Sequence, residues 1–153
     1  MADMGSWRSL IKGLAADAEF MAGASHDQVA KAEEAIGIPL PDELKSLLLE
    51  SDGVQANLGS RVIWSCAELV KQNLELRGFE AFRELYMPFD HLLFIGDDGG
   101  GDQFAFAIHA NGEIAKHDIY RWDHETDGRG WFAGSLKQYF EFRLSSSYFE
   151  RPR

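Results

Sequence analysis

The stretch "LLFIGDDGGGDQFAFAIHANG", residues 92–112, decides the fold. Its first four residues form a continuous apolar run, which is typical of a strand covered on at least one face. Beyond the glycines the pattern alternates, with Phe104, Phe106 and Ile108 on one side. Asn111-Gly112 then predicts a type I′ hairpin turn, because that turn needs φ > 0 at both central positions. The second half of the chain is therefore predicted to form an antiparallel meander.

The same turn predicts a register for the hairpin. If Asn111-Gly112 is the whole turn, the partner strand spans residues 113–123, with Phe106 opposite His117 and Phe104 opposite Ile119. These side chains share one face, which we expect to meet helices, whereas the other face is more polar. Residues 124–130 are predicted to be a polar loop.

Helical signals lie on both sides of this meander. Apolar residues at a 3.6-residue period predict an N-terminal helix over about residues 6–20. Serines followed three residues later by Gln or Glu predict helix starts at Ser25, Ser65 and Ser135. Pro41 and the acids behind it predict another start. We expect a single α+β domain over residues 1–153, with helices around a mainly antiparallel β-sheet, the hairpin and a C-terminal helix.

Composition argues against several classes of protein. The 153 residues carry a formal net charge of −10, from 15 Lys and Arg against 25 Asp and Glu. Such a surface repels phosphate backbones, so we expect no nucleic-acid partner, and it attracts a basic protein. Eight acidic residues against two basic ones lie between positions 97 and 127.

Location is also constrained by the sequence. Cys66 is the only cysteine, which argues against disulfides and Cys-based zinc sites and favours a reducing cytoplasm. The N-terminus lacks the basic and apolar regions of a secretory signal. No apolar run approaches the ~20 residues of a membrane span, so we expect a cytoplasmic protein without a membrane partner.

The glycine-rich segment fits neither of two ligand-binding loop motifs. Gly96 and Gly101 have the glycine spacing of a phosphate-binding P-loop, but Asp102 stands where that motif needs lysine, which inverts the required charge. A calcium loop beginning at Asp97 fails because its third and fifth positions are glycine. A weaker ion site on Asp97, Asp98 and Asp102 stays open as an alternative, and we expect no cofactor and no metal.

The remaining catalytic patterns lack a second group. His124-Glu125 begins like a zinc-protease helix, but position 128 is glycine where the second histidine belongs. Cys66 lies near a helix start, where a thiolate is favoured, yet no His or Asp pairs with it in a recognisable pattern. We therefore predict a protein that is not an enzyme.

The acidic loops and two aromatic residues that we expect to be exposed beside them, Tyr120 and Trp122, are the best candidates for binding a partner, because aromatic residues rimmed by charge often mark protein-binding surfaces. The predicted partner-binding residues are Asp97, Asp98, Asp102, Tyr120, Trp122, Asp123, His124 and Glu125. Gly99, Gly100, Gly101, Asn111 and Gly112 are interpreted as structural turn residues. On this interpretation Gly100→Val destabilises the fold, whereas Asp98→Ala stays folded and changes only partner binding.

Four segments, in order, resemble the SUKH superfamily. They are "IPLPDELKSLLLESDGV" (residues 38–54), "LLFIGDDGGGDQFAFAI" (92–108), "IYRWDHETDG" (119–128) and "AGSLKQYF" (133–140). The resemblance covers about residues 26–145. The N-terminal helix lies outside it, and residues 54–90 match no motif of the family.

The resemblance implies a fold and a role. The superfamily fold is α+β, with helices around a mainly antiparallel sheet and no shared catalytic machinery. Many bacterial members are immunity proteins that bind and neutralise secreted toxin domains, often nucleases. By resemblance, the expected partner is a cognate toxin, and the charge of this chain suggests a basic one. The alternative is a regulatory or scaffold protein like the fungal cell-wall-synthesis regulators, with no toxin partner.

Overall fold

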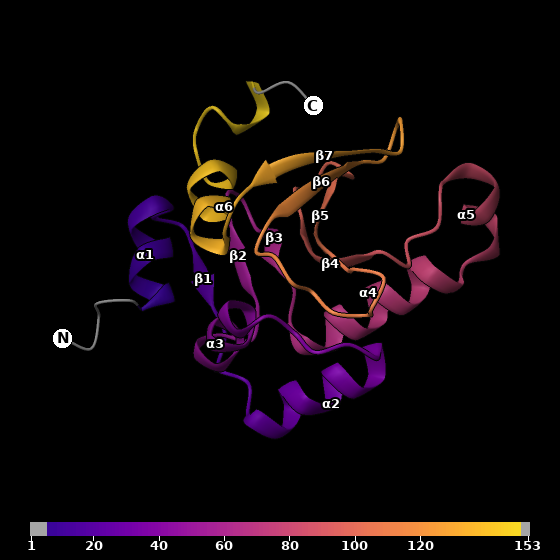
Figure 1. The fold of residues 1–153 in the computed structure, drawn as a ribbon. Helices are drawn as coiled ribbons and strands as arrows, with labels where there is room; N and C mark the ends of the chain where they lie inside the picture. The colour runs from indigo at the N-terminus through magenta and orange to yellow at the C-terminus, as the bar shows by residue number, and fades with distance from the viewer. Residues whose placement is uncertain (1–5, 151–153) are drawn as a thin grey trace.

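The alternating second half of the chain folds into a four-stranded antiparallel sheet. The computed structural model describes residues 6–150 and is shown in Figure 1. The strands follow one another in sequence order: β4 (Leu92–Asp97), β5 (Gln103–Ala107), β6 (Ile119–Asp123) and β7 (Gly128–Ala133). Strand β7 begins inside the predicted loop over residues 124–130. The predicted loop was therefore too long.

The hairpin between β5 and β6 is confirmed, but its predicted turn type and register were wrong. Phe104 pairs with Arg121 rather than Ile119, a shift of two positions that leaves every side chain on its predicted face. In the Asn111-Gly112 pair only Gly112 has a positive φ, 83°, and its amide donates to the carbonyl of His109 at 2.8 Å. The turn is therefore not type I′, and the residues between β5 and β6 form a longer connection.

A smaller sheet forms from β1 (Glu19–Phe20), β2 (Val54–Ala56) and β3 (Ser60–Ile63). Its first strand corrects the N-terminal prediction: helix α1 (Trp7–Leu14) ends well before residue 20. Between them, the Asp17 carboxylate accepts the amides of Asn57 and Leu58 at 3.0 Å each. These hydrogen bonds hold the segment after α1 against the turn between β2 and β3. The segment makes them in place of a further turn of helix.

The two sheets meet at β3 and β4. The amide of Trp64 donates to the carbonyl of Ile95 at 2.8 Å. Beside this bond, a Cβ on Gly96 would lie 2.0 Å from the carbonyl oxygen of Val62. Position 96 therefore requires glycine, because a side chain there would keep the backbones of β3 and β4 apart. The fold is one α+β domain with two antiparallel sheets.

Most helices begin at the predicted caps. The remaining helices are α2 (His26–Ile36), α3 (Asp42–Glu50), α4 (Cys66–Gly78), α5 (Glu80–Leu85), α6 (Leu136–Arg143) and the 3-10 helix η1 (Tyr148–Glu150). Full capping boxes are present at Ser25 and Ser65, and Ser135 accepts the amide of Gln138. In Figure 1, α2 lies beside α4, α4 packs against β4, and α5 projects at the right of the view.

Aromatic residues cover both faces of the four-stranded sheet. On one face, Phe104 packs against Phe132 and Tyr139, with ring centres 4.9 and 5.1 Å away. On the other, Trp122 packs against Phe89 from the segment after α5, at 5.3 Å. Within residues 6–150, no helix is long and apolar enough to span a bilayer.

Candidate functional site

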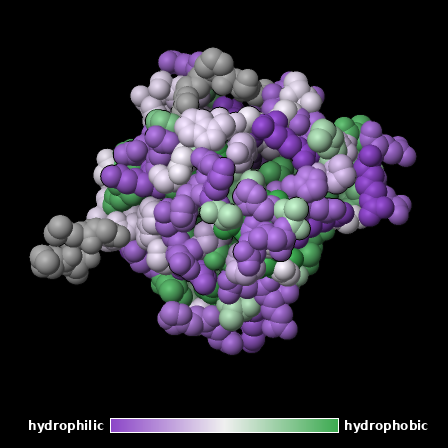
Figure 2. Space-filling view, viewed as in Figure 1, coloured by the Kyte–Doolittle hydropathy of each residue, from purple (hydrophilic) through white to green (hydrophobic). Residues whose placement is uncertain are grey.

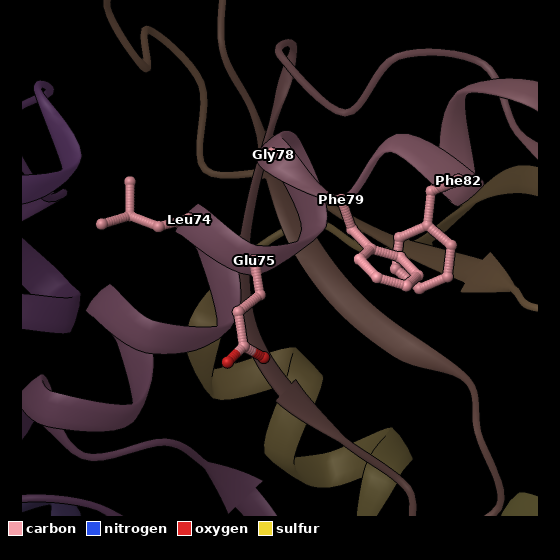
Figure 3. A pocket seen from close by; sticks show the side chains of 5 residues that line it. All are labelled: Leu74, Glu75, Gly78, Phe79 and Phe82. Atoms are coloured by element: carbon pink, nitrogen blue, oxygen red, sulfur yellow. The ribbon is translucent and has the colours of Figure 1, made fainter.

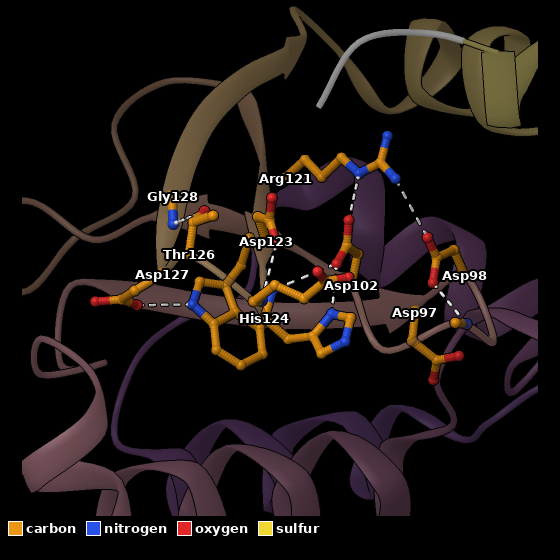
Figure 4. Close-up of polar contacts among 12 residues, drawn as sticks. Asp97, Asp98, Asp102, Arg121, Asp123, His124, Thr126, Asp127 and Gly128 are labelled. Atoms are coloured by element: carbon orange, nitrogen blue, oxygen red, sulfur yellow. Dashed lines mark hydrogen bonds and ion pairs between the residues drawn. The ribbon is translucent and has the colours of Figure 1, made fainter.

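The glycine-rich turn between β4 and β5 is shaped by its own aspartates (Figure 4). The Asp97 carboxylate accepts the amide of Gly99 at 2.9 Å, and the Asp98 carboxylate accepts the amide of Gly100 at 2.8 Å. Such bonds to the backbone two residues on are typical of turns that aspartate stabilises. Gly99 and Gly101 have positive φ values of 79° and 110°, whereas Gly100 is not among the positive-φ glycines.

Asp98 and Asp102 point into the protein, with 6% and 2% of their surfaces exposed. Arg121 on β6 lies between them, its Nε 2.9 Å from Asp102 Oδ2 and its Nη2 3.5 Å from Asp98 Oδ2. Buried carboxylates are stable only when such partners replace water. These two aspartates therefore fasten the turn to β6 and do not form its outer surface.

The C-terminal segment closes against the same cluster. The Tyr148 hydroxyl donates to Asp98 Oδ2 at 2.9 Å, and burial, followed by the Asp98 charge, raises the pKa of Tyr148 above its usual range. The guanidinium groups of Arg121 and Arg143 lie 4.7 and 4.9 Å from the centre of the Tyr148 ring. Sequence reasoning missed Arg143 and Tyr148, because nothing near them in the sequence indicates a contact with a turn almost 50 residues away.

His124 is held in one orientation. Its Nδ1 lies 2.7 Å from Asp102 Oδ1, and its backbone amide donates to the same oxygen at 3.3 Å. A Cβ on Gly101 would lie 2.6 Å from the His124 ring, so the ring needs glycine beneath it. About a third of the His124 side chain, 35%, is exposed. The buried carboxylate thus presents one edge of this imidazole to solvent.

The turn between β6 and β7 is organised by Asp127, a residue missed as part of the site. Its carboxylate accepts the indole N–H of Trp122 and the amide of Met87, both at 2.8 Å, and pairs with Arg129 at 3.0 Å. Burial alone raises the pKa of Asp127, but these hydrogen bonds outweigh it and hold the pKa below its usual value. The backbone of Asp127 has a positive φ of 62°, and this conformation cannot be recognised from the sequence around it.

The structure separates the eight predicted binding residues into two groups. Asp98, Asp102 and Trp122 are buried, so the expectation that Trp122 is exposed was wrong. The others lie at least partly at the surface: Asp97, Tyr120, Asp123, His124 and Glu125. Between the two loops is a hollow of about 220 Å³, lined mainly by the Asp98–Arg121–Asp102 cluster, His124 and Glu125.

One group of side chains has metal-ligand geometry. Asp102, Asp123 and His124 each offer a donor atom, and these atoms lie within 4.8 Å of one another. Both Asp102 oxygens, however, already contact Arg121 and His124, and a cation there would lie against the guanidinium. The weaker ion site considered on Asp97, Asp98 and Asp102 meets similar competition, because these carboxylates bind Trp64, Tyr148 and backbone amides. The geometry suits a structural charge cluster better than a metal centre.

The family model for the SMI1 / KNR4 family (SUKH-1) matches residues 23–141, most of the chain. The chain belongs to the SMI1 / KNR4 (SUKH-1) family. The matched region runs from just before α2 into α6 and includes both acidic loops, whereas α1 and β1 precede it. No curated protein matches the chain. This SUKH-1 family is generally non-catalytic, and membership is consistent with an immunity or regulatory protein.

Proposed function

We propose that this SUKH-1 protein is an immunity protein that binds and neutralises a cognate toxin domain in the cytoplasm. Family membership carries the proposal, because the matched region contains the four strands that the two acidic loops connect. The partner is proposed to be a basic domain, such as a nuclease, since such a domain is attracted to a chain of net charge −10.

The proposed contact surface is formed by the two acidic loops together. Residues 97–102 and 123–127 carry six carboxylates and no Lys or Arg, and Asp98 and Asp102 among them are buried. Glu125 is exposed, and Asp97, Asp123 and His124 are partly exposed. The buried Asp98–Arg121–Asp102 cluster supports this surface, because it fixes both loops to the same strand. A fixed set of charges costs less ordering entropy on binding than a mobile one.

Co-expression tests the proposal. A candidate toxin domain is sought in the reading frames adjacent to this gene and induced in cells with or without this protein. Survival only in the presence of the protein supports the proposal. Equal killing in both cultures contradicts it. Capture of envelope or signalling proteins from such cells, with no toxin bound, points instead to the alternative regulatory role within the same family.

Association kinetics test the contact surface separately. Glu125→Lys is expected to slow association several-fold at low salt and much less at high salt, because exposed charges act mainly through screened long-range attraction. The matched control is Glu34→Lys, an equal charge reversal at an exposed position on α2. If both variants associate equally fast at low salt, the acidic loops are not the contact surface.

A further inference from the structure

A second surface of different chemistry lies where α4 meets α5. Four large apolar side chains are well exposed there: Leu74 (46%), Phe79 (54%), Leu85 (67%) and Met87 (63%). Helix α5 buries none of its residues. In Figure 2, hydrophobic side chains appear among hydrophilic ones over α5, at the right of the view. Exposed apolar residues gathered in one place, unlike single ones, mark interaction sites.

This surface contains a formed hollow. A depression of about 680 Å³ is lined by Leu74, Glu75, Gly78, Phe79 and Phe82 (Figure 3). The rings of Phe79 and Phe82 meet edge to face, 4.9 Å between centres. Phe82 in turn packs against Phe89, which contacts Trp122 in the core. The wall of the hollow is therefore continuous with the core.

The charged side chain that lines the hollow is acidic. Among the described residues, Glu75 is the only charged residue that lines it, and Glu80 directly follows Phe79, whereas the exposed Lys71 and Arg83 lie four residues from Glu75 and Phe79 and do not line the hollow. Within residues 6–150, neither glutamate makes an ion pair with a basic side chain. The nearest arginine in sequence, Arg77, turns inward, and its guanidinium donates to the carbonyls of Ile36 and Leu92. The hollow is thus apolar with an acidic edge.

We propose that this hollow binds an amphipathic helix of a protein partner, with apolar anchor residues flanked by Lys or Arg. The apolar side chains of such a helix would enter between Leu74 and Phe79, and its basic residues would meet Glu75 and Glu80. A second copy of this chain fits less well, since it would bring together two molecules of net charge −10. The inference goes beyond the proposed function, because it concerns another face and holds for a toxin or a regulatory partner.

Fluorescence anisotropy with three labelled synthetic helices tests the inference. The probe is a Leu–Lys amphipathic peptide of about five helical turns, and the two comparison peptides replace Lys by Glu or Leu by Ser. The Leu–Lys peptide is expected to bind, and the other two to bind at least about tenfold more weakly. Equal binding of the Leu–Glu peptide, or no binding of the Leu–Lys peptide, overturns the inference.

Protein variants locate the site. Phe79→Ser and Glu75→Lys are each expected to weaken Leu–Lys binding about tenfold or more. The matched controls, Leu58→Ser and Glu141→Lys, change exposed residues elsewhere and should leave binding unchanged. Circular dichroism verifies folding, and Leu74→Ser replaces Phe79→Ser if that variant does not fold. Equal binding by site and control variants, or a concentration-dependent dimer lost in Phe79→Ser, overturns the inference.

Discussion

Among single residues, the glycines of the turn between β4 and β5 differ sharply in what they allow. Gly101 has a positive φ, and a Cβ there would enter the space of the His124 ring. At Gly100, a Cβ would lie 3.4 Å from the Asp98 carboxylate, an ordinary contact. The sequence contains three adjacent glycines without indicating which one the fold requires, and our expectation from sequence named Gly100 rather than Gly101.

Gly101→Ala is therefore expected to lower the free energy of unfolding by about 2 kcal/mol, through strain at positive φ and displacement of His124. Gly100→Ala is the matched control and should change it by less than about 1 kcal/mol. Urea unfolding followed by circular dichroism measures both. Similar losses in the two variants would show that the turn is arranged differently.

Asp98→Ala is expected to destabilise the protein by about 3 kcal/mol, contrary to the expectation from sequence that it stays folded and affects only binding. The substitution leaves the amide of Gly100 and the hydroxyl of Tyr148 without their acceptor and removes a partner of Arg121. Glu125→Ala, at an exposed position of the neighbouring loop, is the control. Unfolding midpoints in urea that coincide for the two variants would show that Asp98 has no structural role.

The Cys66 thiol provides a test of pH dependence. Burial, followed by the nearby Asp52 charge, raises the pKa of Cys66 to about 12. The thiol is ionised more easily in the unfolded chain, so stability falls as pH rises from about 9 towards 12. At pH 8 we expect a thiol reagent to label Cys66 slowly in the native protein and fast in urea. Equally fast labelling in both states would contradict the burial of the Cys66 thiol.

At the scale of secondary-structure elements, one buried side chain joins helix α4 to strand β4. The side-chain amide of Asn73 donates to the carbonyl of Phe94, and its oxygen accepts the amide of Phe94, both at 2.9 Å. Strand β4 is an edge strand of its four-stranded sheet. At Phe94, Asn73 therefore makes the two hydrogen bonds that a neighbouring strand would otherwise make.

Asn73→Ala is expected to cost about 2–4 kcal/mol, because it leaves a buried donor and a buried acceptor of Phe94 unsatisfied. Lys71→Ala, at an exposed position of the same helix, should cost far less. Denaturant unfolding gives the energies, and hydrogen exchange should show weaker protection of the Phe94 amide. Unchanged protection of that amide would contradict the proposed role of Asn73.

Local signals predicted the helix starts but not all of the strands. The capping boxes at Ser25 and Ser65 are bonds between residues three apart, so a short sequence contains all the information they need. The β5–β6 register depends on a long connection, and β7 contains glycines that weaken a strand signal. Strand β1 exists only through its pairing with β2, which lies more than 30 residues away.

At the scale of the whole molecule, the sequence gives the charge of the two acidic loops but not their arrangement in space. The sequence located the two acidic loops, and the fold brings them together around Arg121. It did not reveal that Asp98 and Asp102 face inward, because an aspartate in a glycine-rich segment looks the same whether it is solvated or paired. The sequence also did not predict the apolar hollow between α4 and α5. Its apolar residues do not follow a helical period that would separate an exposed face from a buried one.

We propose that this SUKH-1 protein neutralises a basic toxin domain by direct binding. The most direct measurement is the activity of a purified candidate toxin domain, sought among the genes adjacent to this one, during titration with purified protein. The account predicts that activity disappears at one molar equivalent of wild-type protein and that Glu125→Lys inhibits more slowly than wild type at low salt. Full toxin activity in the presence of a large excess of wild-type protein would contradict it.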